Sequence, residues 1–153
     1  MPTVEERLAA LGLTVHEVIP PVAAYVPAVV SGRYVFTAGQ LPFVDGVLAE
    51  TGKVGAEVSP ERASELAAIC ALNAIAAVKS VVPLETVVRV VKVVGFVASA
   101  PDFTGQPGVM NGASNLLLEA FGDIGAHARS AVGVAVLPLD APVEVELIVE
   151  VAD

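Results

Sequence analysis

The segment Thr86–Ala98 constrains the fold of this chain more than any other. It reads Thr-Val-Val-Arg-Val-Val-Lys-Val-Val-Gly-Phe-Val-Ala, and this run of β-branched residues predicts a strand. Alternate residues of a strand point to opposite faces, so both faces are mainly apolar, with Arg89 on one and Lys92 on the other. A strand that is apolar on both faces needs a cover on each side. We expect a long helix on one side and a second copy of the chain on the other.

Capping signals and turn residues locate the other elements. Thr3-Val4-Glu5-Glu6 has the pattern of a capping box and predicts a short extra helix within residues 1–12. Ser59-Pro60-Glu61 combines a capping serine, a proline in the first turn and an acidic residue, which is typical of a helix start. The predicted helices are 3–12, 59–81 and 113–121, the last after a Gly- and Pro-rich loop at 102–112, and the predicted strands are 25–30, 34–38, 86–98, 128–137 and 143–151. With no linker or repeat, residues 1–153 are expected to form one domain.

The last two predicted strands carry the candidate chemistry. The short link 138–142 suggests that they form a hairpin, and Glu144, Glu146 and Glu150 alternate with apolar residues along the second strand. A register that joins the apolar faces of the two strands places Arg129 on the same side as these glutamates. The small residues that follow Arg129 leave room there for a ligand.

These residue types suit a small molecule that carries a carboxylate. The guanidinium of Arg129 matches a carboxylate bidentately, and Glu144 can hold or activate a water molecule. Simpler interpretations remain open for each candidate. Arg129 can equally serve a structural or intersubunit ion pair, Glu144 can be a solvated sheet residue, and Tyr25 can pack in the core or an interface. Asn115 can be an exposed or locally bonded amide.

Charge and hydropathy narrow the class of function. The formal net charge is −9 with only eight Lys plus Arg, which argues against nucleic acid as a partner because such binding depends on neutralising phosphates. The chain is 55% hydrophobic with a mean hydropathy of +0.75, yet no run reaches the roughly 18 to 20 apolar residues that span a bilayer. The charged residues Glu5, Glu6 and Arg7 do not suit a signal peptide. We therefore expect a cytoplasmic oligomer that does not enter membranes.

Cysteine and histidine are too few for several common kinds of site. The single cysteine, Cys70, excludes a disulfide within the chain and lies in a predicted helix among apolar residues, where a buried and inert thiol is expected. His16 and His127 are far apart in sequence and suggest no metal site.

Several short motifs give the chain a family resemblance from Tyr25 to Val151. They are Tyr25-Val26, Phe36-Thr37-Ala38-Gly39-Gln40-Leu41-Pro42, the helix start at Ser59, Phe96-Val97, Asn115 followed by Glu119-Ala120-Phe121, Ala128-Arg129-Ser130, Leu137-Pro138 and Val143-Glu144-Val145. In order and spacing they resemble the Rid family of reactive intermediate deaminases, also called YjgF-type or L-PSP endoribonuclease proteins. The resemblance implies an α+β, chorismate-mutase-like fold: a mixed sheet with two main helices on one face, assembled as a homotrimer with sites in clefts between subunits.

The resemblance also implies an activity. Deaminating members hydrolyse enamine and imine intermediates, such as 2-aminoacrylate, to 2-oxo acids and ammonia, without a cofactor or metal. By motif, Arg129 would bind the substrate carboxylate and Glu144 would orient or activate the attacking water. Tyr25 and Asn115 would line the pocket, and the backbone at Gly39 and Ala131 would hydrogen-bond the ligand.

The chain departs from the archetypal pattern in several places. The stretch between Phe96-Val97 and Asn115 is longer, the stretch from Asn115 to Arg129 is shorter, and residue 131, often cysteine in the family, is alanine. Together with the extra N-terminal helix, these features resemble a divergent branch, in which the longer loop would border the pocket. Two other functions stay open: a trimer that binds a 2-oxo acid without turnover, and an endoribonuclease for single-stranded RNA, which the acidic charge disfavours.

Overall fold

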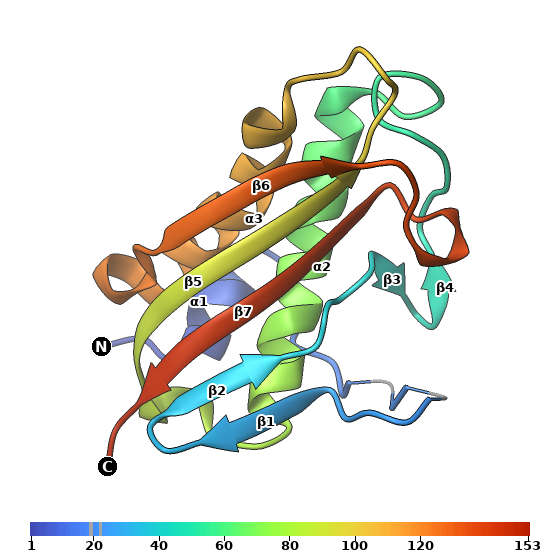
Figure 1. Ribbon diagram of the computed structural model, residues 1–153. Helices are drawn as coiled ribbons and strands as arrows, with labels where there is room; N and C mark the ends of the chain where they lie inside the picture. The colour runs from blue at the N-terminus through green and yellow to red at the C-terminus, as the bar shows by residue number, and fades with distance from the viewer. Residues whose placement is uncertain (19, 22) are drawn as a thin grey trace.

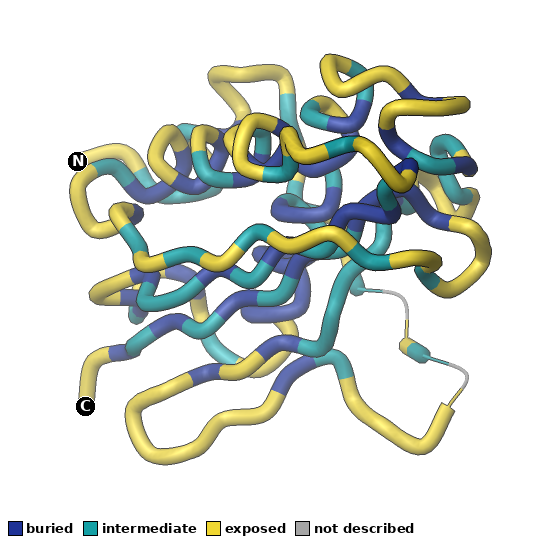
Figure 2. Tube along the Cα trace, turned by 45° about the horizontal axis from the view of Figure 1, so that its top comes forward, coloured by how far each residue is buried: buried dark blue, intermediate teal, exposed yellow. Residues whose placement is uncertain are grey.

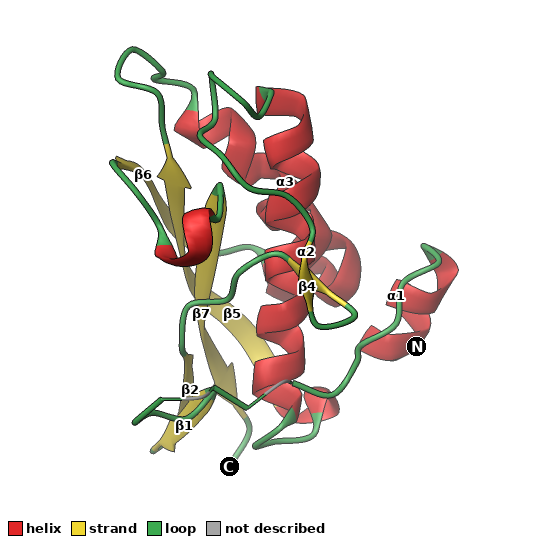
Figure 3. Ribbon diagram, turned by 90° about the vertical axis from the view of Figure 1, so that its right-hand side faces the viewer, coloured by secondary structure: helices red, strands yellow, loops and turns green. Residues whose placement is uncertain are grey.

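A mixed sheet forms one layer of the computed structural model, and two long helices form the other (Figures 1 and 3). The structure describes residues 1–18, 20–21 and 23–153. The strand order of the main sheet is β1-β2-β7-β5-β6, and all neighbours are antiparallel except β5 and β6, which are parallel. The strands are β1 (Ala28–Ser31), β2 (Tyr34–Thr37), β5 (Val87–Ala98), β6 (Ala128–Val134) and β7 (Val143–Val151), with a small separate pair β3 (Phe43–Val44) and β4 (Val47–Leu48).

The helices are α1 (Val4–Ala10), α2 (Pro60–Lys79) and α3 (Gln106–Phe121), with short 3-10 turns η1 (Leu84–Thr86), η2 (Gly122–Gly125) and η3 (Pro138–Asp140). Both α2 and α3 pack on the same face of the sheet, while α1 lies beside them, away from the sheet (Figure 3). The buried residues run between these layers, and the exposed residues line the outside (Figure 2). The predicted fold, an α+β mixed sheet with two main helices on one face, is confirmed.

The predicted starts of α1 and α2 are confirmed in atomic detail. The Thr3 hydroxyl accepts from the Glu6 N–H at 3.1 Å, and the Glu6 carboxylate accepts from the Thr3 N–H at 2.8 Å, so the capping box is complete. The Ser59 hydroxyl accepts from the Arg62 N–H at 3.1 Å, and Pro60 occupies the first turn of α2. No helix among the described residues is long and apolar enough to cross a membrane.

The strand β5 is confirmed, but its two basic residues do not lie on opposite faces as predicted. Irregularities in the pairing with β7 shift the register, so Arg89 lies opposite Glu150 and Lys92 lies opposite Ile148. A β-bulge adds one residue to the strand and thereby reverses the alternation beyond it. Both basic residues therefore share the sheet face that α2 and α3 leave open. The expected cover on that face, a second copy of the chain, stays a prediction.

The predicted hairpin of the last two strands is wrong. The strand β5 lies between β6 and β7, and β6 runs parallel to β5. The first of these strands ends at Val134, before the predicted end at residue 137, so residues 135–142 are free to pass over the end of β5. Strand alternation fixes which residues share a face, but it does not fix which strand is the neighbour.

This topology reverses the predicted side of the arginine. Arg129 lies opposite Val93 of β5, and Val93 lies opposite Leu147 of β7. Val93 and Leu147 are both buried beneath the helices. Glu144 lies opposite Phe96, on the open face. The prediction that Arg129 shares a face with the glutamates is therefore wrong.

The third helix begins earlier than predicted. Residues 106–112, expected to belong to a loop, form the first turns of α3. Pro107 is compatible with the first turn, where its missing N–H has no helical partner to lose. Gly112 is needed because α3 passes so close to α2 that a Cβ there would lie 1.9 Å from the Ser64 carbonyl oxygen. The signal that suggested a loop thus marks a close helix–helix contact.

The predicted strand 25–30 also begins too early. The first strand starts at Ala28, and Tyr25 lies in a bend before it. The second strand, predicted to end at Ala38, ends at Thr37.

Candidate functional site

Arg129 projects from β6, an edge strand of the main sheet, onto one side of α3. Its Nη1 donates to Asn111 Oδ1 at 3.0 Å and to Ser114 Oγ at 3.2 Å, and its Nη2 donates to the Pro107 carbonyl oxygen at 3.2 Å. Positions 107, 111 and 114 follow helical spacing and face the same way. The first three turns of α3 therefore form a cradle for the guanidinium.

The positive charge of Arg129 is not neutralised within the described residues. All three acceptors are uncharged, and none of the ion pairs of the described residues involves Arg129. A guanidinium has about five N–H groups. The three hydrogen bonds therefore leave two N–H groups, one of them on Nε, for a further acceptor. The arrangement is suited to an anion with two oxygens, such as a carboxylate.

Ser114 connects Arg129 to a histidine. The Ser114 Oγ lies 2.8 Å from His127 Nε2, and His127 Nδ1 lies 2.6 Å from the Gly125 carbonyl oxygen. The three side chains, from α3, from the segment before β6 and from β6 itself, form one continuous hydrogen-bonded row.

Glu144 lies at the start of β7, on the open face of the sheet, and its side chain folds over Gly39. A Cβ at position 39 would lie 1.9 Å from Glu144 Oε1, so a larger residue there would push this carboxylate out of its position. The backbones of Gln40 and Val145 hold the two segments together through N–H to O distances of 2.8 and 3.0 Å. Partial burial, and then the neighbouring charge of Glu146, raise the pKa of Glu144. A carboxyl of this kind is suited to exchanging protons with a substrate or a water molecule.

The other predicted site residues lie in different parts of the molecule. Tyr25 is 57% exposed and precedes β1, at the sheet edge opposite β6. Ala131 lies two residues beyond Arg129 on β6 and is partly buried. Asn115 is exposed on α3 and is not among the hydrogen-bond partners of Arg129. The roles expected for these residues stay predictions.

A single chain thus brings Gly39 and Glu144 together, but it keeps Arg129 apart from them on the other face of the sheet. The sequence did not indicate that Asn111, Ser114 and His127 lie in the surroundings of Arg129. The spacing of 107, 111 and 114 would have suggested a shared helix face, had residues 106–112 been recognised as helical.

Other kinds of site find little support. Cys70 is buried, as expected, and desolvation raises the pKa of its thiol well above the usual range. Within the described part of the chain, no group of three or more His, Cys, Asp or Glu side chains could hold a metal ion.

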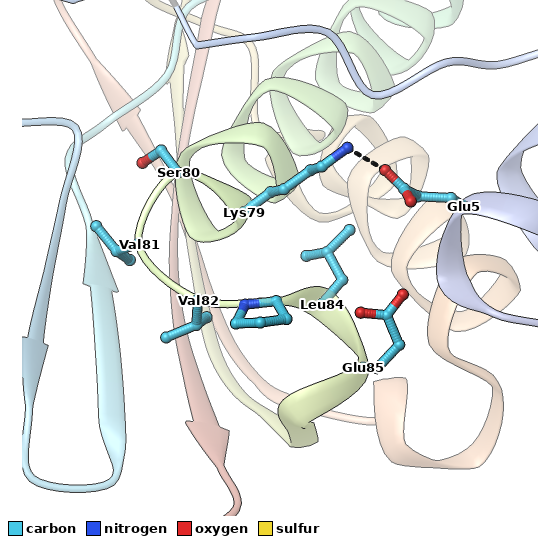
Figure 4. Close-up of a pocket in the computed structure, with 8 residues that line it drawn as sticks. Glu5, Lys79, Ser80, Val81, Val82, Leu84 and Glu85 are labelled. Carbon is cyan, nitrogen blue, oxygen red and sulfur yellow. Dashed lines mark hydrogen bonds and ion pairs between the residues drawn. The ribbon is translucent and has the colours of Figure 1, made fainter.

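An open hollow of about 410 Å³ lies between the C-terminal end of α2 and α1 (Figure 4). An ion pair between Lys79 and Glu5 crosses it, and the segment 80–85 forms the rest of its lining. None of the predicted site residues lines this hollow, so it offers no support for the site described above.

Comparison with known proteins gives a consistent assignment. The sequence model of a family described as YjgF/chorismate mutase-like, putative endoribonuclease matches residues 5–151. Protein TCP17 of Trypanosoma cruzi is 41% identical over 149 residues, which cover 96% of this chain and 93% of that protein.

Solved structures differ in how far they resemble this one. The Agrobacterium tumefaciens protein Atu1372, of unknown function, is 44% identical, covers 99% of this chain and 94% of its own, and superposes with a TM-score of 0.91. E. coli TdcF with bound serine is 26% identical, with 89% and 94% of the two chains covered and a TM-score of 0.56. This contrast agrees with the expectation of a divergent branch.

Proposed function

The chain belongs to the YjgF/chorismate mutase-like family, and from this membership we propose that it hydrolyses reactive imines of 2-amino acids. The proposed substrates are 2-iminobutanoate, 2-iminopropanoate and the tautomeric 2-aminoacrylate, and the products are 2-oxo acids and ammonia. The observation that carries the proposal is the guanidinium of Arg129, which is held by three neutral acceptors and keeps two N–H groups for a carboxylate.

The ligand of a relative supports this substrate class. TdcF was solved with bound serine, a small molecule with a carboxylate next to a carbon that bears nitrogen. The proposed imines share this arrangement. The carboxylate would bind Arg129, while the carbon–nitrogen bond extends away from it.

We propose that the site is composite and forms in a homotrimer. Arg129 lies at the β6 edge on the helix side, whereas Glu144 and Gly39 lie on the open face, so a neighbouring subunit must supply one of the two groups. The open face carries exposed apolar side chains, among them Phe36 at 44% and Val132 at 44% exposure. Burial of such a face between subunits is favourable.

In the proposed reaction the protein supplies positioning and a proton relay. Arg129 binds the carboxylate and orients the iminium carbon. Glu144 takes a proton from water as the water oxygen bonds to that carbon and the C=N electron pair moves to nitrogen, giving a carbinolamine. Glu144 then returns the proton to nitrogen, the C–N bond breaks, and ammonia leaves. The hydroxyl gives its proton to the Glu144 carboxylate, which passes it to water, and the C–OH group becomes the carbonyl. No cofactor is needed because an iminium is already electrophilic.

A trimer that binds 2-oxo acids without turnover is the second candidate. The observation that favours it is that Glu144, the proposed base, lies on the other face of the sheet from the Arg129 cradle of the same chain. An endoribonuclease is disfavoured because the net charge of −9 repels phosphates.

The proposal is tested by ammonia and 2-oxo acid release from freshly generated imines, comparing the wild-type protein with Arg129→Ala. Loss of the carboxylate anchor is expected to lower kcat/KM by roughly 100-fold or more. Arg62→Ala is the matched control, because Arg62 already pairs with Glu50 and Glu65 and should leave the rate unchanged. If the wild-type protein accelerates no imine yet binds 2-oxo acids, the second candidate replaces the first.

A further inference from the structure

We infer that Ser114 and His127 are positioning residues that fix the guanidinium of Arg129 for carboxylate binding. This inference rests on the proposed function and adds to it two residues outside the family motifs. The observation behind it is the row Arg129–Ser114–His127–Gly125, in which each neighbouring pair lies within hydrogen-bond distance.

With a neutral His127 ring, chemistry assigns a direction to every hydrogen bond in this row. The Gly125 carbonyl oxygen only accepts, so His127 Nδ1 carries the hydrogen and donates at 2.6 Å. In the neutral ring, Nε2 is then an acceptor and receives the Ser114 hydroxyl hydrogen at 2.8 Å. With its hydrogen directed to the histidine, Ser114 Oγ presents a lone pair to Arg129 Nη1. One arrangement thus satisfies all three groups.

The row matters because it restricts the orientation of the Arg129 guanidinium. A serine hydroxyl can rotate and act as donor or acceptor, and a mid-helix serine often bonds the preceding turn of its own helix. His127 removes this freedom and keeps Ser114 as an acceptor for the guanidinium. Together with Asn111, it orients Nη1 along α3, so that Nε and the remaining Nη2 hydrogen stay available.

His127 is itself held from both sides. Its ring lies between Gly125 and Ser114, and Gly125 is the last residue of η2, the 3-10 turn that directly follows α3. A Cβ at position 125 would lie 2.5 Å from the Leu117 carbonyl oxygen, so this turn packs tightly on α3. The histidine therefore has a rigid base, as a residue that orients another should have.

The first test needs no ligand. The ¹⁵N shifts of His127 in the full-length protein should show the tautomer with hydrogen on Nδ1. Rotation of the Arg129 guanidinium, followed by NMR, should be faster in Ser114→Ala and His127→Phe and return to the wild-type rate in Ser114→Thr. Ser80→Ala, which removes another partly buried hydroxyl that bonds a backbone oxygen, is the control. Hydrogen on Nε2, or an unchanged guanidinium in both variants, would overturn the inference.

The second test separates positioning from general damage. Titration with 2-oxobutanoate is expected to show a Kd about three- to tenfold weaker in Ser114→Ala, in the range of one lost hydrogen bond, with Ser114→Thr near wild type. Binding of the uncharged 2-oxobutanamide should not change. Because the two residues act in series, the Ser114→Ala, His127→Phe double variant should resemble the single variants. Equal weakening for both ligands would overturn the inference, whereas a wild-type protein that binds neither ligand but keeps the restricted guanidinium would overturn only the proposed function.

Discussion

At the scale of the residue, the two groups proposed to carry the chemistry each have a feature that a ligand or a water molecule can use. Arg129 keeps two N–H groups that have no acceptor among the residues that the structure describes, and Glu144 is a half-buried carboxylate beside Glu146. Both could be singled out from the sequence, because an arginine and a glutamate stood at regular strand positions among apolar residues. The partners of Arg129 could not, because Asn111 lies in helical turns that were predicted to be a loop. Ser114 lies within the predicted helix, but it meets Arg129 only because α3 packs beside β6.

Glu144 should lower the stability of the folded protein where it is ionised. Its pKa is raised above the usual value of 4.5, so the folded state holds this proton more tightly than the unfolded chain does. The stabilisation from the protonated form is complete below the unfolded pKa and is lost as the pH rises through the folded pKa. We expect Glu144→Gln to melt at a higher temperature than the wild-type protein at pH 8, with the difference shrinking toward pH 4.

The measurement is the melting temperature of both proteins across this pH range. Glu119→Gln, at an exposed position of α3, controls for the loss of one negative charge. A difference between Glu144→Gln and wild type that is independent of pH would mean that burial does not disfavour the charged carboxylate.

At the scale of the element, local sequence signals predicted where helices begin, but they did not predict which elements are neighbours. The caps of α1 and α2 are encoded by adjacent residues such as Thr3 and Ser59, which act wherever the helix packs. The pairing of β6 with β5 depends instead on the path of residues 135–142, which nothing in strand alternation specifies. The role of Gly112 could not be predicted either, because it depends on how closely α2 packs against α3.

Two glycines of α3 offer a matched pair of substitutions. Gly112→Ala would place a Cβ 1.9 Å from the Ser64 carbonyl oxygen, so the helices must separate, at a cost of about 1–3 kcal/mol. The Cβ of Gly108→Ala would meet no atom within 4 Å outside its chain neighbours and the nearby backbone of α3, so the substitution should stabilise the helix by about 0.5–1 kcal/mol. Urea unfolding at one protomer concentration measures both. Equal effects of the two substitutions would show that helix propensity, not the α2–α3 contact, decides the outcome.

At the scale of the whole molecule, the sheet separates the two side chains that the proposed reaction needs, Arg129 and Glu144. The helices cover one face and cradle Arg129, while the other face carries Glu144 together with exposed apolar side chains such as Phe36. The sequence predicted the need for two covers from the apolar faces of β5, but it suggested that arginine and glutamate share one face. Their separation makes the oligomer a requirement of the proposed reaction and not only a means of hiding apolar surface.

The most direct test of this account is the activity of mixed oligomers. Arg129→Ala and Glu144→Gln, each inactive alone, are unfolded together in equal amounts and refolded, and imine hydrolysis is measured. If each site takes Arg129 from one subunit and Glu144 from another, random assembly should restore about one quarter of the sites to the intact pair. A mixture that stays as inactive as its two components would contradict a composite site.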